Sequence, residues 1–282
     1  MGRIVTAYIT ALEDDGKPSV PRRKDAWKAM KGFWENVMPA VIDKPMAKAY
    51  RATRKVADAT ARYELMLLST ALQWAIDNKD VTKILSRPTI WLPPQPERKT
   101  RHLTRKQFDR FLNAIVAPHA KLYAMIGIHT MARPSAILEL TWDRVNFMRG
   151  LIDFNPAGRN QTVKRRPIVP ISDDLMPVLQ TAYKSRTSVN VIERGGEPIA
   201  SIKKAFQAAS ERSNVHATPY TLRHTGAVWA AEGGAPMTQL AQFMGHDDDR
   251  TTQKHYARFS PDFLRDVANA VTRKPVQKRG SI

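Results

Sequence analysis

Apolar residues recur at helical spacing in the first third of the chain. Between residues 61 and 76 (ARYELMLLSTALQWAI) they fall every three or four positions, the spacing that places side chains on one face of a helix. Residues 91–102 (WLPPQPERKTRH) then bring three prolines and several charges, which cannot continue a helix. We therefore predict a helical N-terminal domain over residues 1–90, followed by an extended linker over residues 91–103.

A second domain is predicted to start at Thr104. Thr104 and Gln107 have the spacing of a capping box, which indicates a helix from Arg105 to Ile115. Ser172 is expected to cap a further helix that ends near residue 185. Other helices are predicted at residues 201–212, 221–232, 238–244 and 251–256, with a last one from Pro261.

Short strands interrupt this helical pattern. Residues 151–154 (LIDF) and 167–170 (PIVP) flank a polar, basic turn, and another short strand is expected at residues 189–192. The expected fold is therefore mainly α with a small β-sheet (α+β). The second domain is taken to cover residues 104–271, with a basic C-terminal tail over residues 272–282.

The composition narrows the choice of partner and excludes several chemistries. Lys and Arg number 45 against 26 Asp and Glu, a formal net charge of +19, and both predicted domains have an excess of basic side chains. Such a charge is typical of proteins that bind nucleic acid. Because the chain has no cysteine, it cannot form a disulfide, a thiol nucleophile or a cysteine-ligated zinc site.

Neither a membrane segment nor a metal site is expected. No apolar run reaches the roughly 18 residues of a spanning helix, and the N-terminus lacks the apolar core of a signal peptide. Asp247, Asp248 and Asp249 are consecutive and cannot all face one ion, so they are interpreted as a polar loop and helix cap.

Four clusters of residues carry candidate chemistry. They are ARPSAILEL at residues 132–140, the basic turn QTVKRR at 161–166, YTLRHT at 220–225, and MGH at 244–246 leading to HYAR at 255–258. Their order, with Tyr256 ten positions after His246, resembles the tyrosine recombinase family, in particular the integrases of phages and integrative mobile elements. The resemblance is strongest from Arg133 to Phe263 and is consistent over the first domain. It implies a helical core-binding domain, which holds the core DNA site, followed by a tyrosine recombinase catalytic domain.

The residue types fit strand cleavage at a phosphodiester. Guanidinium groups bind non-bridging phosphate oxygens bidentately and stay charged, which suits Arg133 and Arg223. Lys164 is assigned as the general acid for the leaving 5′-oxygen, and Tyr256 as the nucleophile. The alternatives are arginines that are ordinary surface groups and a Tyr256 that belongs to the core. Arg165 could also replace Lys164 at the phosphate, because relatives often carry the lysine one place earlier in this turn.

Two further site residues follow from the resemblance. His246 would hydrogen-bond the phosphate, the alternative being a simple capping role at the end of a helix. Tyr220 stands where relatives usually have histidine, and a phenol can donate to a phosphate but is a poor proton acceptor near neutrality. His224 and His255 are interpreted as structural, because neighbouring residues do not share a helix face.

The resemblance implies a site-specific DNA recombinase or integrase that cleaves and rejoins double-stranded DNA through a 3′-phosphotyrosine intermediate, with no cofactor and no metal. It implies a homotetramer on the recombination sites and leaves open an accessory directionality factor. The expected location is the cytoplasm, at the nucleoid, in a prokaryotic or phage-encoded setting. The first domain begins so early that we expect no additional arm-binding domain. The alternatives are a catalytically weak or inactive DNA-binding regulatory or architectural protein of the same fold, and a type IB topoisomerase.

Overall fold

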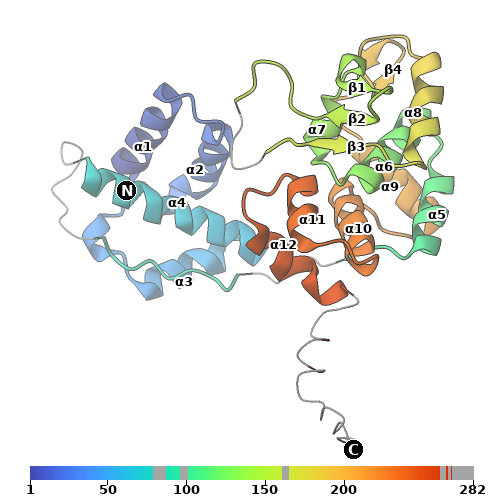
Figure 1. Ribbon diagram of the computed structural model, residues 1–282. Helices are drawn as coiled ribbons and strands as arrows, with labels where there is room; N and C mark the ends of the chain where they lie inside the picture. The colour runs from blue at the N-terminus through green and yellow to red at the C-terminus, as the bar shows by residue number, and fades with distance from the viewer. Residues whose placement is uncertain (79–86, 96–100, 161–164, 261–264, 266–267, 269–282) are drawn as a thin grey trace, which may run out of the picture. The chain divides into compact units, whose positions relative to one another are not determined.

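The computed structural model describes residues 1–78, 87–95, 101–160 and 165–260, together with residues 265 and 268. It divides into two compact units, Met1–Lys99 and Thr100–Ile282. Helices dominate both units, and the strands that the structure describes lie in the second (Figure 1). The prediction of a mainly α fold with a small β-sheet is confirmed.

The described residues of the first unit form four helices. These are α1 (Gly2–Asp14), α2 (Val20–Trp34), α3 (Lys44–Thr53) and α4 (Asp58–Asp77), with the 3-10 turn η1 (Pro39–Val41) between α2 and α3. Helix α4 contains the segment whose apolar spacing predicts a helix, and Leu65, Leu68 and Leu72 on it are fully buried. They belong to one apolar cluster with Trp34 and Tyr50, so α4 provides the centre of this unit's core.

A buried carboxylate ties α3 and α4 together. Glu64 on α4 is 2% exposed and accepts a hydrogen bond from the Tyr50 hydroxyl at 2.5 Å. The Arg54 guanidinium, just after α3, donates to both of its oxygens at 2.6 and 3.0 Å. These donors compensate the burial of the charge, which would otherwise destabilise the unit.

The helices of the second unit agree broadly with the sequence pattern. They are α5 (Arg105–Ala114), α6 (Pro118–Thr130), α7 (Pro134–Leu138), α8 (Leu175–Lys184), α9 (Lys203–Ser213), α10 (Pro219–Glu232), α11 (Met237–Met244) and α12 (Asp249–Tyr256), with the 3-10 turns η2 (Trp142–Arg144) and η3 (Ala257–Phe259). The capping box predicted at Thr104 and Gln107 is confirmed, with hydrogen bonds of 3.2 and 2.9 Å. A second box, formed by Thr218 and Thr221, starts α10 at Pro219, earlier than predicted.

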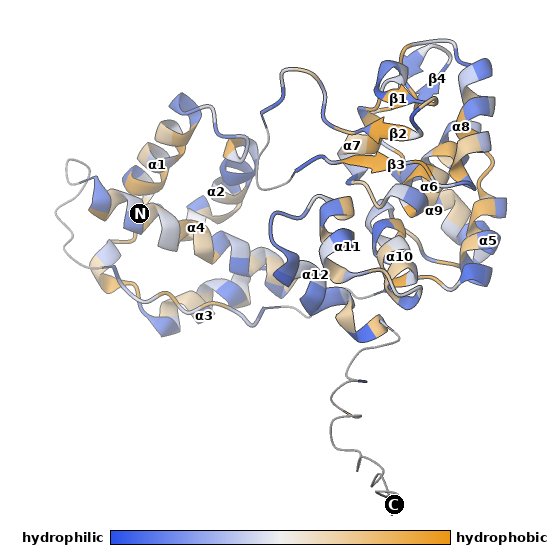
Figure 2. Cartoon of the chain, viewed as in Figure 1, coloured by the Kyte–Doolittle hydropathy of each residue, from blue (hydrophilic) through white to orange (hydrophobic). Residues whose placement is uncertain are grey.

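The three-stranded sheet is antiparallel, in the order β1 (Val145–Asn146), β2 (Leu151–Asp153), β3 (Ile168–Pro170). Ile152 on β2 is opposite Val169 on β3, and both side chains are fully buried. The strands are coloured as hydrophobic in Figure 2. The strands predicted on either side of the basic turn are therefore confirmed, and a second, two-stranded hairpin is formed by β4 (Glu193–Arg194) and β5 (Glu197–Pro198).

Two local expectations are wrong. Residues 189–192 form a loop with a single antiparallel bridge, between Asn190 and Thr141, instead of a strand, because the pairing with residues 140–142 extends no further than this bridge. Ser172 does not cap α8, because its hydroxyl is hydrogen-bonded to Nδ1 of His129 at 2.9 Å. The helix predicted from Pro261 begins outside the described residues.

Helices α6 and α10 cross closely at Gly226. A Cβ atom at this position would lie 2.3 Å from the Ile128 carbonyl oxygen and 2.9 Å from Cγ of Met131. Only glycine allows this approach. The contact places the C-terminal end of α6 beside the middle of α10, where Arg223 lies.

Candidate active site

Arg223 is a buried cation held by backbone carbonyls. It lies on α10 and is 6% exposed. Its Nη1 donates to the carbonyl of Met131 and its Nη2 to the carbonyl of Met244 at 2.9 Å. Burial, with repulsion from Arg133, lowers the pKa of Arg223 to about 10, so the group is still charged at neutral pH.

Arg133 lies beside the same loop, as the residue that precedes α7. Its Nη2 donates to the carbonyl of Gly245 at 3.0 Å and its Nη1 to the carbonyl of Arg165. Burial lowers the pKa of Arg133. Within the described ranges, neither Arg133 nor Arg223 forms an ion pair with a carboxylate. The backbone carbonyl groups orient the two guanidinium groups but do not neutralise their charge. Both guanidinium groups therefore keep the positive charge that binding of an anion requires.

The backbone around the arginines takes left-handed conformations at two helix ends. Met131, after α6, has φ 50°, and Gly245, after α11, has φ 66°. A Cβ atom on Gly245 would lie 2.6 Å from the Arg165 carbonyl oxygen and 2.7 Å from Cδ of Pro167. Glycine is therefore required twice at residue 245, for its dihedral angle and for its lack of a side chain. Its presence lets the end of the basic turn pack against the loop after α11.

His246 connects Arg223 to α12. Its Nε2 lies 3.0 Å from Nη2 of Arg223, and its Nδ1 lies 2.7 Å from the Thr252 hydroxyl. Because a guanidinium can only donate, Nε2 must accept, and the proton of the neutral ring belongs on Nδ1. Burial and the charges of Arg223 and Arg133 lower the pKa of His246 to about 4, so the ring is neutral at pH 7.

Tyr256 ends α12 and is 3% exposed. Its hydroxyl lies 2.6 Å from Nδ1 of His224, the residue after Arg223 on α10. Burial raises the pKa of Tyr256 to about 12, although Arg223 acts in the opposite direction. The tyrosine is therefore a neutral hydrogen-bonded phenol next to the arginine cluster.

Tyr220 differs from the other candidates in being open to solvent. It lies in the first turn of α10, one helical turn before His224, and is 59% exposed. Burial lowers the pKa of both Arg133 and Arg223, and the charge interaction with Tyr220 acts in the opposite direction on both. Tyr220 therefore lies close to both cations. Its exposure leaves the phenol accessible to a molecule that binds at the arginines.

Lys164 lies outside the described residues, and its assignment as general acid stays a prediction. The next residue, Arg165, forms an ion pair with Asp247 at 2.6 Å. Its carbonyl accepts from Arg133, so the end of the basic turn reaches the arginine cluster through backbone atoms. The structure thus brings the basic turn to the candidate site without locating its lysine.

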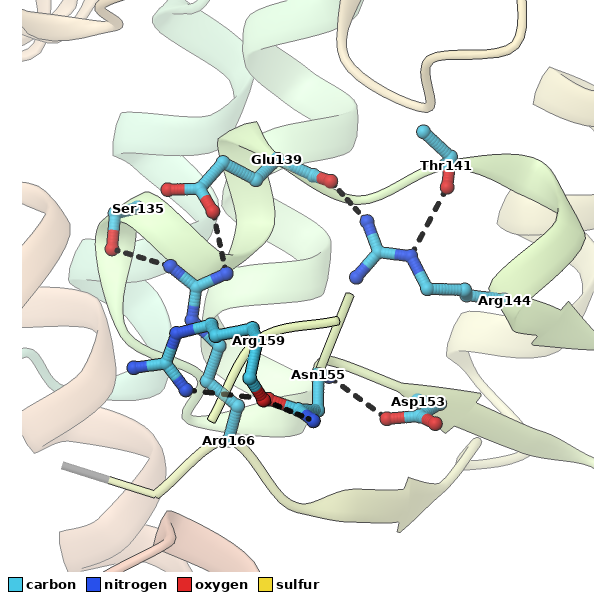
Figure 3. Close-up of polar contacts among 8 residues, drawn as sticks. All are labelled: Ser135, Glu139, Thr141, Arg144, Asp153, Asn155, Arg159 and Arg166. Carbon is cyan, nitrogen blue, oxygen red and sulfur yellow. Dashed lines mark hydrogen bonds and ion pairs between the residues drawn. The ribbon is translucent and has the colours of Figure 1, made fainter. Parts of the chain in front are cut away.

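The last residue of the basic turn, Arg166, is fixed to α7 and the residue that follows it. Arg166 is 8% exposed, forms a 2.6 Å ion pair with Glu139 and contacts the Ser135 hydroxyl at 3.4 Å (Figure 3). Hydrogen bonding to Arg166 lowers the pKa of Glu139. Arg159, on the other side of the turn, bonds Asn155 at 3.2 Å. The contacts of Arg166 fix its side of the turn beside the helix that follows Arg133, whereas the bond between Arg159 and Asn155 is local to the other side.

His224 contacts the candidate nucleophile Tyr256, a contact that the sequence analysis did not predict. Arg223 and His224 do occupy different faces of α10, as expected for neighbours. However, α10 contacts both α11 and α12, so its two faces meet two parts of one site. The position of His224 four residues after Tyr220 is the signal that could have identified it, because residues at that spacing share a face.

The acidic run after His246 has separate partners. Asp247 pairs with Arg165, Asp248 accepts from the backbone of Arg250 at 2.8 Å, and Asp249 accepts from the Gln253 amide at 3.0 Å. Over the described ranges, no group of three or more His, Asp or Glu side chains could hold a metal ion. The helices described there include none that is long and apolar enough to cross a membrane.

The chain matches a known protein family. Residues 101–262 match the model of the phage integrase family. An integrase of Streptomyces ambofaciens is 24% identical over 197 residues, which is 58% of this chain and 50% of that protein. The tyrosine recombinase XerD of Staphylococcus aureus (strain N315) is 28% identical over 153 residues, 50% of each protein. The chain thus spans about half the length of these relatives.

The fold is shared with a solved structure of a DNA-bound protein. The Tn1549 transposon integrase (residues 82–397), in complex with circular intermediate DNA, superimposes with a TM-score of 0.73 at 18% identity. The match covers 95% of this chain and 99% of that one. At this identity the similarity shows a common fold.

Proposed function

Because this chain belongs to the phage integrase family, we propose that it is a site-specific DNA recombinase that cleaves and rejoins DNA through a 3′-phosphotyrosine intermediate. One observation carries the proposal. Two arginines without carboxylate partners in the described ranges, Arg133 and Arg223, converge with His246 beside a buried tyrosine hydroxyl. An anionic phosphate is a ligand whose charge and hydrogen-bond acceptors match this arrangement.

The residues divide the reaction among themselves. Arg133 and Arg223 bind the non-bridging oxygens and stabilise the charge that grows on them in the transition state. The Tyr256 oxygen forms a bond to phosphorus while the bond to the 5′-oxygen breaks. Lys164 protonates that leaving oxygen. The reverse reaction, with the 5′-hydroxyl of another strand, reseals the DNA, so no nucleotide cofactor is consumed.

Tyr220 and His246 assist by positioning. The exposed hydroxyl of Tyr220 can donate to a phosphate oxygen. His246 holds Arg223 at Nε2 and is itself held by Thr252, which fixes the guanidinium plane.

The proposed partner is double-stranded DNA. The formal charge of +19 supports this choice, with the helical domain of residues 1–90 on the core site and residues 91–103 as the linker. Each active site cuts one strand, and exchange between two duplexes requires four cuts. A homotetramer on the paired sites supplies four tyrosines. An accessory directionality factor would bias this assembly toward excision, and the protein would work at the nucleoid.

Covalent capture tests the function without a known target sequence. A library of randomised duplexes, nicked so that the cleaved end diffuses away, is incubated with the protein, and DNA that resists denaturing washes is sequenced. We expect one enriched site from the parent chain and none from Tyr256→Phe. Joining of two enriched sites distinguishes a recombinase from a topoisomerase. Site-specific binding with no covalent product would instead support the architectural alternative.

A further inference from the structure

The hydrogen bond between His224 and Tyr256 joins the nucleophile to a basic nitrogen. Nδ1 of His224 lies 2.6 Å from the Tyr256 oxygen, and the ring centroids are 5.9 Å apart. Tyr256 is 3% exposed, so bulk water has little access to its hydroxyl. A proton that leaves this oxygen during attack needs an acceptor within the protein.

The protonation states favour transfer from tyrosine to histidine. Burial, assisted by Arg223 and His255, lowers the pKa of His224, so its ring is neutral near pH 7. The Tyr256 hydroxyl keeps its proton because burial raises its pKa. The phenol therefore donates and Nδ1 accepts, and the other ring nitrogen carries the ring proton.

The other candidate acceptors near the arginines are less suitable. Both nitrogens of His246 are engaged, Nε2 by Arg223 and Nδ1 by Thr252. Tyr220 is an exposed phenol and a poor base near neutrality. In the part of the chain that the structure describes, His224 is the basic side chain hydrogen-bonded to the nucleophile.

We propose that His224 is a catalytic residue that accepts the proton of Tyr256 as the phenolic oxygen attacks phosphorus. This inference rests on the proposed recombinase function. The Tyr256 O–H bond breaks, the O–P bond forms, and the proton moves to Nδ1 to give an imidazolium. The leaving 5′-oxygen takes its proton separately, from the general acid. In resealing, the imidazolium returns its proton to the tyrosine oxygen, so the pair is restored after each cycle.

Replacing His224 by asparagine separates proton transfer from hydrogen bonding. The Oδ1 atom of the introduced asparagine would occupy the place of Nδ1 and accept the hydrogen bond, but an amide cannot take the proton. We expect His224→Asn to slow single-turnover formation of the covalent complex by about 10²–10⁴. DNA affinity and the unfolding midpoint should stay at the parent values. The matched control is His216→Asn, an exposed histidine outside the site, which should cleave at the parent rate.

Three outcomes separate the hypotheses. A parent chain that forms no covalent complex overturns the proposed function itself. A parent that cleaves, with His224→Asn at the same rate, overturns the catalytic role of His224. If His224→Asn cleaves normally while His224→Ala does not, His224 only holds the tyrosine, and the proton-acceptor assignment is wrong.

A substrate with a sulfur leaving group shows whether His224 acts on the tyrosine nucleophile or on the leaving group. In a 5′-bridging phosphorothiolate duplex the leaving thiolate needs no proton, so a variant that lacks the general acid should regain its rate. The His224→Asn defect should persist, because the tyrosine proton still has to leave. Full rescue of His224→Asn would place His224 on the leaving-group side and overturn the proposal.

The parent chain gives a test that needs no substitution. The groups acting on His224 are Arg223 on its own helix and His255 and Tyr256 on α12. Since only the neutral ring can accept the proton, and burial holds the pKa of His224 below the ordinary histidine value of about 6.5, cleavage should slow only at a pH below that value. A rate constant that stays unchanged down to about pH 4 would overturn the proposal even if every variant at residue 224 fails to fold.

Discussion

Replacing Arg223 by methionine should separate stability from activity. Methionine fills a similar volume but makes none of the three hydrogen bonds that Arg223 makes, to Met131, Met244 and His246. Each buried carbonyl that loses its donor costs about 1–3 kcal/mol. The pKa of Arg223 falls from 12.5 to about 10, which corresponds to a penalty of roughly 3 kcal/mol on the charged form from burial and from repulsion by Arg133. That penalty disappears in the variant.

The two effects largely cancel, so the free energy of unfolding should fall by no more than about 3 kcal/mol. Cleavage has no such compensation. Loss of one donor to transition-state charge lowers the rate by about 10²–10³. Single-turnover trapping on a nicked substrate and urea unfolding should therefore respond very differently to the same substitution.

Arg212→Met provides the matched control. Arg212 also donates to a backbone carbonyl, that of Ala114 at 2.6 and 2.9 Å, but it is exposed and lies outside the site. This variant should cleave at the parent rate. Parent-like cleavage by Arg223→Met would remove Arg223 from the active site. A loss of stability well above about 3 kcal/mol, with cleavage reduced only in proportion to the unfolded fraction, would show that the residue is structural.

Four further predictions concern the nucleophile, the loop glycine, metal dependence and pH. Tyr256→Phe should abolish covalent trapping with DNA affinity almost unchanged, and trapping at the parent level would exclude Tyr256 as nucleophile. Gly245→Ala should lower the free energy of unfolding by more than the roughly 1–2 kcal/mol that a left-handed backbone costs, because the added Cβ meets the Arg165 backbone. The control is Gly195→Ala, where the backbone is also left-handed but a Cβ has open space. Equal losses of unfolding free energy in the two variants would contradict this prediction. Cleavage should persist in excess EDTA, and recovery only on adding magnesium would refute the proposed mechanism. The pKa of His246 is about 4 in the folded state, so the unfolded state takes up a proton at a higher pH than the folded state does. The free energy of unfolding should therefore fall as the pH is lowered from about 6.5 toward 4. In His246→Gln, the free energy of unfolding should depend less steeply on pH over this range.

The elements that sequence predicts well are those with local causes. The capping box at Thr104 depends on two residues three positions apart, and β2 and β3 depend on short apolar runs beside a polar turn. The run at residues 189–192 has the same appearance, but it is apolar because Val191 packs into the core. Local pattern cannot distinguish a core-lining loop from a strand.

The site was predictable in its residue types and less so in its contacts. Arg133, Arg223 and His246 are recognised by order and spacing, and the structure brings them together. That their partners are backbone carbonyls depends on the left-handed ends of α6 and α11, which no side-chain pattern specifies. The position of His224 against Tyr256 depends on α10 and α12 meeting, a long-range contact of the second unit.

The use of main-chain oxygens to hold the guanidinium groups has a consequence for engineering. Carbonyls of residues 131, 165, 244 and 245 act as the acceptors, and every amino acid carries the same carbonyl. The exposed side chain of Arg165 can therefore be randomised in a search for new target specificity without deleting a support of the two arginines, whereas the side chains of Met131 and Met244 are buried in the apolar core. Insertions, deletions and prolines in these loops move the supports themselves. Libraries that diversify side chains at fixed loop length should thus retain far more active variants than libraries that vary loop length.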